Sequence, residues 1–157
     1  MDIGKYQKLF GVGPLGLLFS LICLGLLWLL DRSLDHVALL NSPRPMMLAG
    51  MGFLAIWLCW QFWCIRSIRQ WWKHDRLCTM GPYRFVRHPI YAGGILLASL
   101  GICLMFDSWI LLLLPVIQFP MYSILVRKEE VMMTAVFGEE YQRYASKTGR
   151  LFPKLFS

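Results

Sequence analysis

Residues 89–126 decide the fold of this chain and read PIYAGGILLASLGICLMFDSWILLLLPVIQFPMYSILV. They form two uncharged apolar runs of 18 residues, 89–106 and 109–126, which are separated only by Asp107 and Ser108. Apolar runs of this length are candidates for transmembrane helices. Because the gap leaves no room for a longer connection, it predicts a tight helical hairpin.

Two more apolar runs precede the hairpin. Residues 9–30 carry no charge over 22 positions, about 33 Å of helix at roughly 1.5 Å per residue, which crosses a hydrocarbon core of roughly 30 Å. This run follows Lys5 and Lys8 but is too long for a signal peptide and ends without a small-residue cleavage site. Residues 46–65 form the second run, after a polar loop at 31–45. We therefore predict an all-α polytopic membrane protein with four transmembrane helices.

Composition agrees with a single integral membrane domain over residues 1–157. The chain is 57% hydrophobic and 16% charged, whereas soluble domains are about a quarter charged. Its net charge of +7 comes without a nucleic-acid-binding motif, so an anionic membrane face is the expected partner. Five cysteines, an odd number without Cys-x-x-Cys spacing, predict packing residues and neither disulfides nor a metal site; they are Cys23, Cys59, Cys64, Cys78 and Cys103.

The basic residues predict the orientation in the membrane. With four spans, the N-terminus, residues 66–88 and residues 127–157 share one side, and that side holds 14 of the 16 lysines and arginines. By the positive-inside rule this side is the cytoplasm, and both termini are cytoplasmic. The start of the first segment, RSIRQWWKHDR, is expected to leave the membrane and lie along its surface. Residues from 127 onward are expected to form a cytoplasmic amphipathic helix.

These two polar segments flank the ends of one hairpin and are therefore predicted to meet. His88 falls at the cap of the helix that begins at Pro89, and Glu129 and Glu130 can accept hydrogen bonds from sugar hydroxyls or an ammonium group. Together these groups suit a polar, zwitterionic cofactor at the cytoplasmic boundary. Each also has a plainer interpretation: His88 as a simple cap, the glutamates as solvated helix surface, and Arg87 as a juxtamembrane anchor. A Ser-His-Asp set, a metal-ligand cluster and a phosphate-binding loop are absent from the sequence.

The order of several short motifs is more specific than any of them alone. They are Gly81-Pro82-Tyr83, Arg87-His88-Pro89-x-Tyr91-x-Gly93, Glu129-Glu130, Phe137-Gly138-x-x-Tyr141-x-x-Tyr144 and Arg150-x-x-Pro153. In this order and spacing, residues 75–153 resemble the isoprenylcysteine carboxyl methyltransferase family, which is related to the phospholipid N-methyltransferases of membranes. Residues 1–65 match only as generic spans.

The resemblance implies an integral membrane enzyme that takes S-adenosylmethionine from the cytoplasm and methylates a lipid-like or amphiphilic acceptor. Carried over position by position, it implies a cofactor site made of Leu77, Cys78, Tyr83, His88, Pro89, Ile90, Tyr91, Glu129 and Glu130. Arg127 lies near the position that meets substrate in the prenylcysteine enzymes, where this chain has Leu125. No residue is assigned as a catalytic base.

The acceptor and the activity remain open at this point. Leu125 argues against a prenylated cysteine, and an aminophospholipid, an isoprenoid or a small thiol are the alternatives. Other classes are a reductase related to membrane sterol reductases, a non-catalytic scaffold, and a transporter suggested by Pro115 and Pro120 in the hairpin. Compact size and the lack of retention signals favour a prokaryotic plasma membrane.

Overall fold

The computed structural model describes residues 13–36, 38–40, 43–72, 74 and 76–154, and within these ranges its regular elements are helices. Two long helices come first, α2 (Gly13–Ser33) and α3 (Pro43–Trp72). The loop predicted at 31–45 is shortened at both ends, because α2 continues to Ser33 and α3 already begins at Pro43. The first two apolar runs are helical as predicted, as far as the described residues reach. The start of the first run, residues 9–12, lies outside the described residues.

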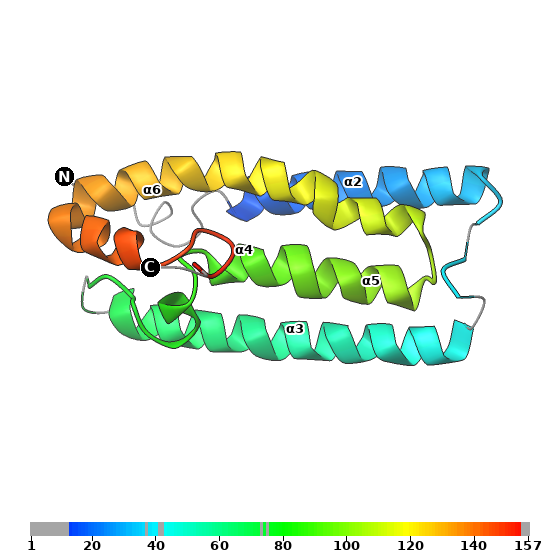
Figure 1. The fold of residues 1–157 in the computed structure, drawn as a ribbon, viewed down its shortest axis with the longest axis horizontal. Coiled ribbons are helices and arrows are strands. Elements are labelled where there is room, and N and C mark those ends of the chain that lie inside the picture. Colours follow the sequence, from blue (N-terminus) through cyan, green and yellow to red (C-terminus); the bar gives the residue numbers. More distant parts are fainter. Residues whose placement is uncertain (1–12, 37, 41–42, 73, 75, 155–157) are drawn as a thin grey trace.

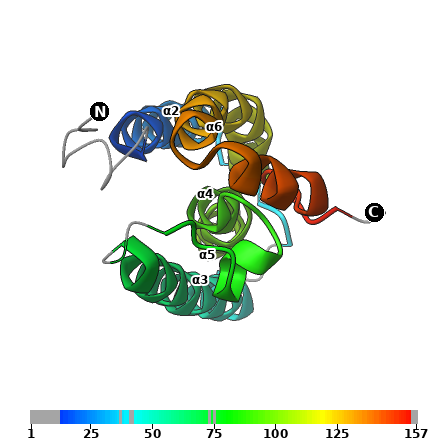
Figure 2. The ribbon, with the colours of Figure 1, turned by 90° about the vertical axis from the view of Figure 1, so that its left-hand side faces the viewer.

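The predicted hairpin is present. Its first arm is one continuous helix made of α4 (Pro89–Gly93), the π-helical turn η2 (Gly94–Ala98) and α5 (Ser99–Met105). After the turn at Phe106–Trp109, the 3-10 turn η3 (Ile110–Leu112) leads into α6 (Leu113–Lys147). Seen end on in Figure 2, the α4–α5 arm lies between α3 on one side and α2 with α6 on the other. Figure 1 shows these helices running side by side along the long axis.

Three of the helical segments are long and apolar enough to cross a membrane: Gly13–Ser33, Pro43–Trp71 and Ile110–Lys147. The fourth predicted span is a shorter apolar helix, Pro89–Met105. The part of α6 before the break at Gly138, residues 113–137, measures about 38 Å at roughly 1.5 Å per residue, more than a hydrocarbon core of roughly 30 Å. The charged part of α6 after Val126 therefore projects beyond the apolar part.

Two predicted boundaries differ from the structure. The segment from Arg66 does not turn aside as a separate surface helix but continues α3 to Trp72, because Ile68 and Trp71 pack against the buried cluster that contains Tyr83. The predicted start of a separate helix at Arg127 falls inside α6, which runs on to a break at Gly138 (φ 53°, ψ −126°). A positive φ with this ψ is accessible to glycine and strained for other residues. Beyond Gly138 the chain folds back along the bundle end (Figure 1).

The hairpin turn is held to the end of α2 and to the chain that follows α2 by buried polar groups. Asp31 accepts hydrogen bonds from Ser108 Oγ at 2.6 Å and pairs with His36 Nδ1 at 2.7 Å. One carboxylate oxygen of Asp107 accepts from the backbone N–H groups of Leu39 and Leu40, at 3.1 Å each. These contacts fix the end of the bundle that lies away from residues 66–88.

Small residues let α3 and α5 approach closely. A Cβ atom at Gly50 would lie 2.5 Å from the backbone nitrogen of Met105 and 2.6 Å from the carbonyl oxygen of Gly101, and one at Gly101 would meet Leu54 at 2.9 Å. Gly101 thus serves close packing, whereas Gly94 has open space beside it.

Candidate functional site

The loop before the hairpin folds as a small core of its own. Gly81 (φ +59°) begins the 3-10 turn η1 (Gly81–Arg84), and a Cβ there would lie 2.5 Å from Ser67 Oγ on α3. Leu77, Cys78 and Tyr83 are buried, and Cys78 and Tyr83 pack with Cys64 of α3. This core seats the loop against α3 and thereby sets the position of residues 84–88.

The start of α4 is tied to α3 by side chains that bind its backbone. Trp60 Nε1 donates to the Pro89 carbonyl at 2.8 Å, and Gln61 Nε2 donates to the Ile90 carbonyl at 3.3 Å. Pro89 is fully buried. His88 is the N-cap residue of α4, as predicted, but its side chain makes no capping hydrogen bond. Its imidazole is therefore available to other partners.

His88 lies between the two adjacent glutamates of α6. Its Nδ1 is 3.2 Å from Glu129 Oε2 and its Nε2 is 3.6 Å from Glu130 Oε1. The second distance is too long for a hydrogen bond, and Nε2 is buried without a hydrogen-bond partner among the described residues. A buried polar atom left without a partner costs about 1–3 kcal/mol. The predicted meeting of residues 66–88 with residues 127–157 therefore occurs, and it occurs at His88.

Tyr91 completes the surroundings of Glu129. The Tyr91 hydroxyl donates to Glu129 Oε1 at 2.7 Å. Its ring stacks on the imidazole of His88, with centroids 6.0 Å apart and an interplanar angle of 15°, and lies 5.2 Å from the ring of Tyr122. A carboxylate, an imidazole and an aromatic face thus come together at the first turn of the apolar helix α4.

Glu130 belongs to an ion network that joins three segments of the chain. It accepts from Arg87 Nε at 2.8 Å, from Arg150 Nε at 2.9 Å and from Arg150 Nη2 at 2.6 Å. Arg87 also donates through Nη1 to the carbonyl oxygens of Ala145, at 2.8 Å, and Thr148. Glu130 and Arg87 are mostly buried, whereas Arg150 is partly exposed. The network fastens the C-terminal segment over the loop.

Backbone pairing holds the same segment in place. Val86 and Gly149 form a parallel bridge, and the N–H groups of Arg87 and His88 donate to the carbonyls of Gly149, at 2.8 Å, and Arg150, at 3.1 Å. The C-terminal segment therefore lies directly beside the residue that carries the imidazole. Tyr144 adds a side-chain contact to this pairing, since its hydroxyl donates to the Tyr83 carbonyl at 2.6 Å.

The charges of this cluster shift its pKa values in opposite directions. Burial lowers the pKa of His88, but the carboxylates of Glu129 and Glu130 outweigh burial and raise it above the ordinary value. Burial raises the pKa of Glu130, but the neighbouring imidazole of His88 and hydrogen bonds from Arg150 and Arg87 outweigh it and hold the pKa well below the usual carboxyl range. Glu130 is therefore ionised, and His88 is more readily protonated than a free histidine.

The structure places the sequence-predicted residues in two neighbouring groups and leaves one outside. His88, Tyr91, Glu129 and Glu130 meet directly. In the buried layer beneath this group, Ile90 packs against the cluster that contains Tyr83. The other five predicted residues lie in or beside this layer: Leu77, Cys78, Tyr83, Pro89 and Ile90. Arg127 is exposed on α6.

Sequence reasoning treated Arg87 as a membrane anchor and did not foresee its pairing with Glu130. The roles of Arg150 and Thr148 in holding the C-terminal segment were also missed. The Arg150-x-x-Pro153 motif was the only signal for them, because the partners are 20 or more residues apart along the chain.

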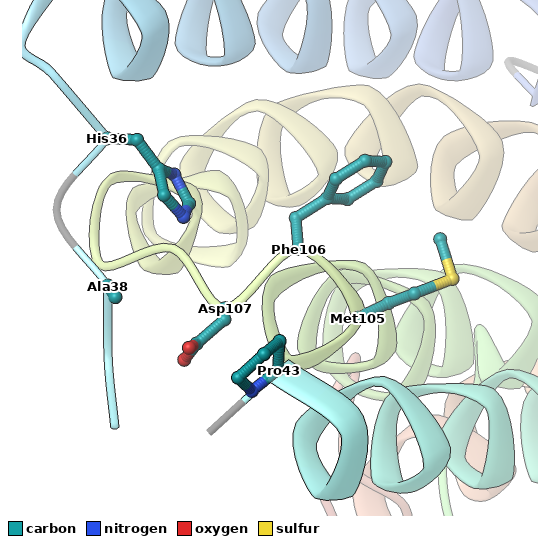
Figure 3. A pocket seen from close by; sticks show the side chains of 6 residues that line it. All are labelled: His36, Ala38, Pro43, Met105, Phe106 and Asp107. Atoms are coloured by element: carbon teal, nitrogen blue, oxygen red, sulfur yellow. The ribbon is translucent and has the colours of Figure 1, made fainter. Parts of the chain in front are cut away.

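Two hollows occur at the far end of the bundle. Figure 3 shows one of about 250 Å³ beside the hairpin turn, lined by His36, Ala38, Pro43, Met105, Phe106 and Asp107. The second, of about 180 Å³, shares His36, Met105 and Phe106. Met105 ends the helical arm that begins at Pro89, so neither hollow is part of the His88 cluster.

A known protein family matches the part of the chain that contains the His88 cluster. Residues 46–140 match the profile of the family described as phospholipid methyltransferase. The cobalt-zinc-cadmium resistance protein CzcN of Cupriavidus metallidurans is 32% identical over 112 residues, 69% of this chain and 50% of that protein. The nickel-cobalt-cadmium resistance protein NccN of Alcaligenes xylosoxydans xylosoxydans is 31% identical over 96 residues, 60% of this chain and 44% of that protein.

The chain thus spans about half the length of these curated relatives. No solved structure matches it. The family profile covers more than half of the chain, from the start of the second apolar run to beyond Glu130, and agrees with the resemblance found in residues 75–153. The three long apolar helices and this profile together support an integral membrane protein. The chain belongs to the phospholipid methyltransferase family.

Proposed function

We propose that this protein is an S-adenosylmethionine-dependent methyltransferase of the membrane that acts on a lipid-like or amphiphilic acceptor. The observation that carries the proposal is the contact of His88 with Glu129, 3.2 Å apart, at the polar end of the apolar hairpin. In a family of membrane methyltransferases, this is the place where a water-soluble cofactor and a lipid-borne acceptor are able to meet.

The residues present fit such a cofactor. S-adenosylmethionine is a zwitterion with a sulfonium cation, and it supplies an electrophilic methyl group when bound. Glu129 offers a carboxylate and Tyr91 an aromatic face beside it. His88 Nε2 is a buried polar atom without a hydrogen-bond partner in the described part of the chain. Buried polar atoms are usually hydrogen-bonded, and a bound polar ligand would supply the missing partner.

The chain's own residues then have three tasks. Glu129, His88 and Tyr91 bind and orient the cofactor, and such positioning supplies about 7–11 kcal/mol of a reaction barrier in favourable cases. The C-terminal segment, fastened by Arg87 and Glu130, keeps water from the reacting groups. The apolar helices hold the acceptor's tail in the bilayer with its head group at the level of His88.

Binding measurements on purified protein test the cofactor assignment. Calorimetric titration with S-adenosylhomocysteine is expected to show about 10- to 100-fold weaker affinity for His88→Ala and Glu129→Ala, because each change removes a hydrogen bond to a charged group. Glu139→Ala, on an exposed position of the same helix, serves as the matched control. Unchanged affinity of both site variants would rule out the assignment. Binding of a nicotinamide nucleotide in place of S-adenosylhomocysteine would favour the reductase alternative.

The acceptor is tested separately. Purified protein is incubated with methyl-labelled cofactor and a total membrane lipid extract, and the labelled product is identified. Leu125, at the position where prenylcysteine enzymes carry arginine, is buried in the bundle, and an aminophospholipid, an isoprenoid or a small thiol therefore rank above a prenylated cysteine. Label in none of these fractions, with cofactor binding intact, favours a non-catalytic scaffold. Arg127→Ala is the variant that tests the substrate contact proposed for Arg127.

A contribution to tolerance of cobalt, zinc or cadmium is a second candidate function, because both curated relatives are named for resistance to such metals. Within the described residues, no group of three or more histidine, cysteine, aspartate or glutamate side chains is placed to hold a metal ion. We therefore expect any such contribution to act through methyl transfer. Complementation of a deletion strain by the His88→Ala variant as fully as by the unchanged gene would contradict this link.

A further inference from the structure

Tyr141 stands out among the aromatic residues of the C-terminal segment because its hydroxyl has no use within the fold. It lies three residues after the break at Gly138 and is 4% exposed. Its hydroxyl oxygen is buried and lacks a hydrogen-bond partner in the described ranges. Tyr144, one turn later, has its hydroxyl bound to the Tyr83 carbonyl at 2.6 Å. The same segment therefore satisfies one tyrosine hydroxyl and not the other.

Tyr141 lies one turn before Ala145, whose backbone carbonyl accepts a hydrogen bond from Arg87 of the Glu130 network at 2.8 Å, so its helical segment borders that network. Burial raises the pKa of Tyr141, the charge of Glu130 raises it further, and Arg87 and Arg150 oppose this effect. The phenol is thus a neutral donor. Glu130 does not serve as its acceptor, since no hydrogen bond joins these two described side chains, whereas Glu130 accepts from Arg87 and Arg150 at 2.6–2.9 Å.

A second buried polar atom, beside Glu130, also lacks a hydrogen-bond partner among the described residues. His88 Nε2 is 3.6 Å from Glu130 Oε1 and has no hydrogen-bond partner within the part of the chain described. When His88 is protonated, this atom is also a donor. Buried polar groups are rarely left unpaired in folded proteins. Two donors beside one ion network that lack partners among the described residues point to an acceptor group supplied by a ligand.

We propose that Tyr141 is a further cofactor-binding residue, whose hydroxyl donates a hydrogen bond to the carboxylate at the amino-acid end of S-adenosylmethionine. This inference rests on the proposed function and deepens it. The carboxylate is the strongest acceptor in that molecule and its only anionic group. With His88 protonated, the two arginines and the histidine exceed the two glutamates by one positive charge, which favours an anion at this place.

The test removes only the hydroxyl, by Tyr141→Phe, and measures binding and stability separately. Affinity for S-adenosylhomocysteine, measured by calorimetry, is expected to fall about tenfold or more, since the lost hydrogen bond involves a charged group. Affinity for 5′-methylthioadenosine, which lacks the amino-acid end, is expected to stay unchanged. The melting temperature without ligand is expected not to fall, because the hydroxyl has no partner in the fold. Tyr144→Phe is the matched control and is expected to lower the melting temperature through its lost bond to Tyr83.

Each other outcome overturns a defined part of the proposal. Equal affinity of Tyr141→Phe and the unchanged protein for S-adenosylhomocysteine overturns this inference alone. Equal weakening for both ligands shows that the hydroxyl does not contact the amino-acid end. A lower melting temperature without a change in affinity, or failure of the variant to fold, assigns Tyr141 to the structure. If the unchanged protein binds neither ligand, the proposed function fails and this inference fails with it.

Discussion

Glu129 and Glu130 are neighbours in the chain but serve different partners. Successive residues of an α-helix point in directions about 100° apart. The two carboxylates therefore approach different ring nitrogens of His88, Glu129 at Nδ1 and Glu130 at Nε2. Glu130 accepts from two arginines and joins the loop to the C-terminal segment. Glu129 accepts from a tyrosine hydroxyl and lies against the imidazole. We therefore propose that Glu130 stabilises the structure of the site and that Glu129 contacts the ligand, although the resemblance implies cofactor contacts for both.

Glu130→Gln is expected to destabilise the protein by about 2–3 kcal/mol. Removing one partner of a fully buried ion pair costs about 3–5 kcal/mol, and the loss is smaller here because the Arg150 side chain is 37% exposed. Thermal unfolding in detergent micelles measures the effect, with Glu139→Gln on the exposed face as control. Equal melting temperatures for the two variants would contradict a structural role for Glu130.

Stability is expected to depend on pH through the same cluster. The pKa of His88 is raised in the folded protein, so its contribution is full below the ordinary pKa of about 6.5 and is lost as pH rises through the folded-state value. The pKa of Glu130 is lowered, so its contribution is present above the ordinary carboxyl value and is lost only in strong acid. Melting temperatures between pH 6 and pH 9 are expected to decline, and His88→Gln is expected to flatten this decline. An equal decline in the variant would show that another group titrates.

Helices α3 and α5 are packed together through glycine. The backbone of Met105 and the carbonyl of Gly101 occupy the space where a side chain at Gly50 would start. Such contact brings two helices close enough for extensive van der Waals packing, the main attraction between helices within a membrane. It also fixes the hairpin against α3, which positions Pro89 and Ile90 through Trp60 and Gln61 near its middle. The alignment of the site therefore depends on the packing of the hairpin's first arm against α3.

Gly50→Ala is expected to lower stability by about 1–3 kcal/mol, the usual range for an added group in a well-packed interior. Gly52 lies two residues later on the same helix with open space beside it, and Gly52→Ala is expected to be neutral or slightly stabilising because alanine favours the helix. Melting temperatures of the two variants, measured side by side, check the contact. Equal effects would mean that α3 and α5 are not packed through Gly50.

At the scale of the whole molecule, the bundle has two polar ends with different chemistry. One end carries the His88 cluster, the Glu130 network and most of the basic residues. The other end carries the hairpin turn and the two hollows, held by Asp31 and Asp107. The positive-inside rule assigns the first end to the cytoplasm, and a cofactor made in the cytoplasm then has direct access to the proposed site.

Reporter fusions in a bacterial host test this orientation. A fluorescent protein that folds only in the cytoplasm, fused after the C-terminus, is expected to fluoresce. Alkaline phosphatase inserted between α2 and α3 is expected to be active, since that loop lies at the opposite end from the C-terminal segment (Figure 1). Phosphatase activity of the C-terminal fusion together with a silent loop insertion would reverse the predicted topology.

Sequence reasoning alone reached the helices and the hairpin, because uncharged apolar runs of 18 residues or more have few stable alternatives in a membrane. It also reached the meeting of residues 66–88 with residues 127–157, since both must emerge at one end of the hairpin. It placed two boundaries wrongly, at Arg66 and Arg127, because the helical backbone continues where hydropathy changes. Hydropathy indicates whether a helix is surrounded by lipid or by water. It does not indicate where the backbone hydrogen bonds of the helix end.

Only the tertiary structure decided which charged groups pair. Arg87 is 43 residues from Glu130 along the chain, and Tyr83 is 61 residues from Tyr144, so no local pattern relates them. The break at Gly138 turns the segment after it back over the loop, where backbone pairing with Val86 fixes its position. The sequence by itself therefore determined the spans and the kind of groups at their polar end. Only when distant segments pack together do Glu129 and Glu130 gain different partners, and only then are His88 Nε2 and the Tyr141 hydroxyl buried without a hydrogen-bond partner among the described residues.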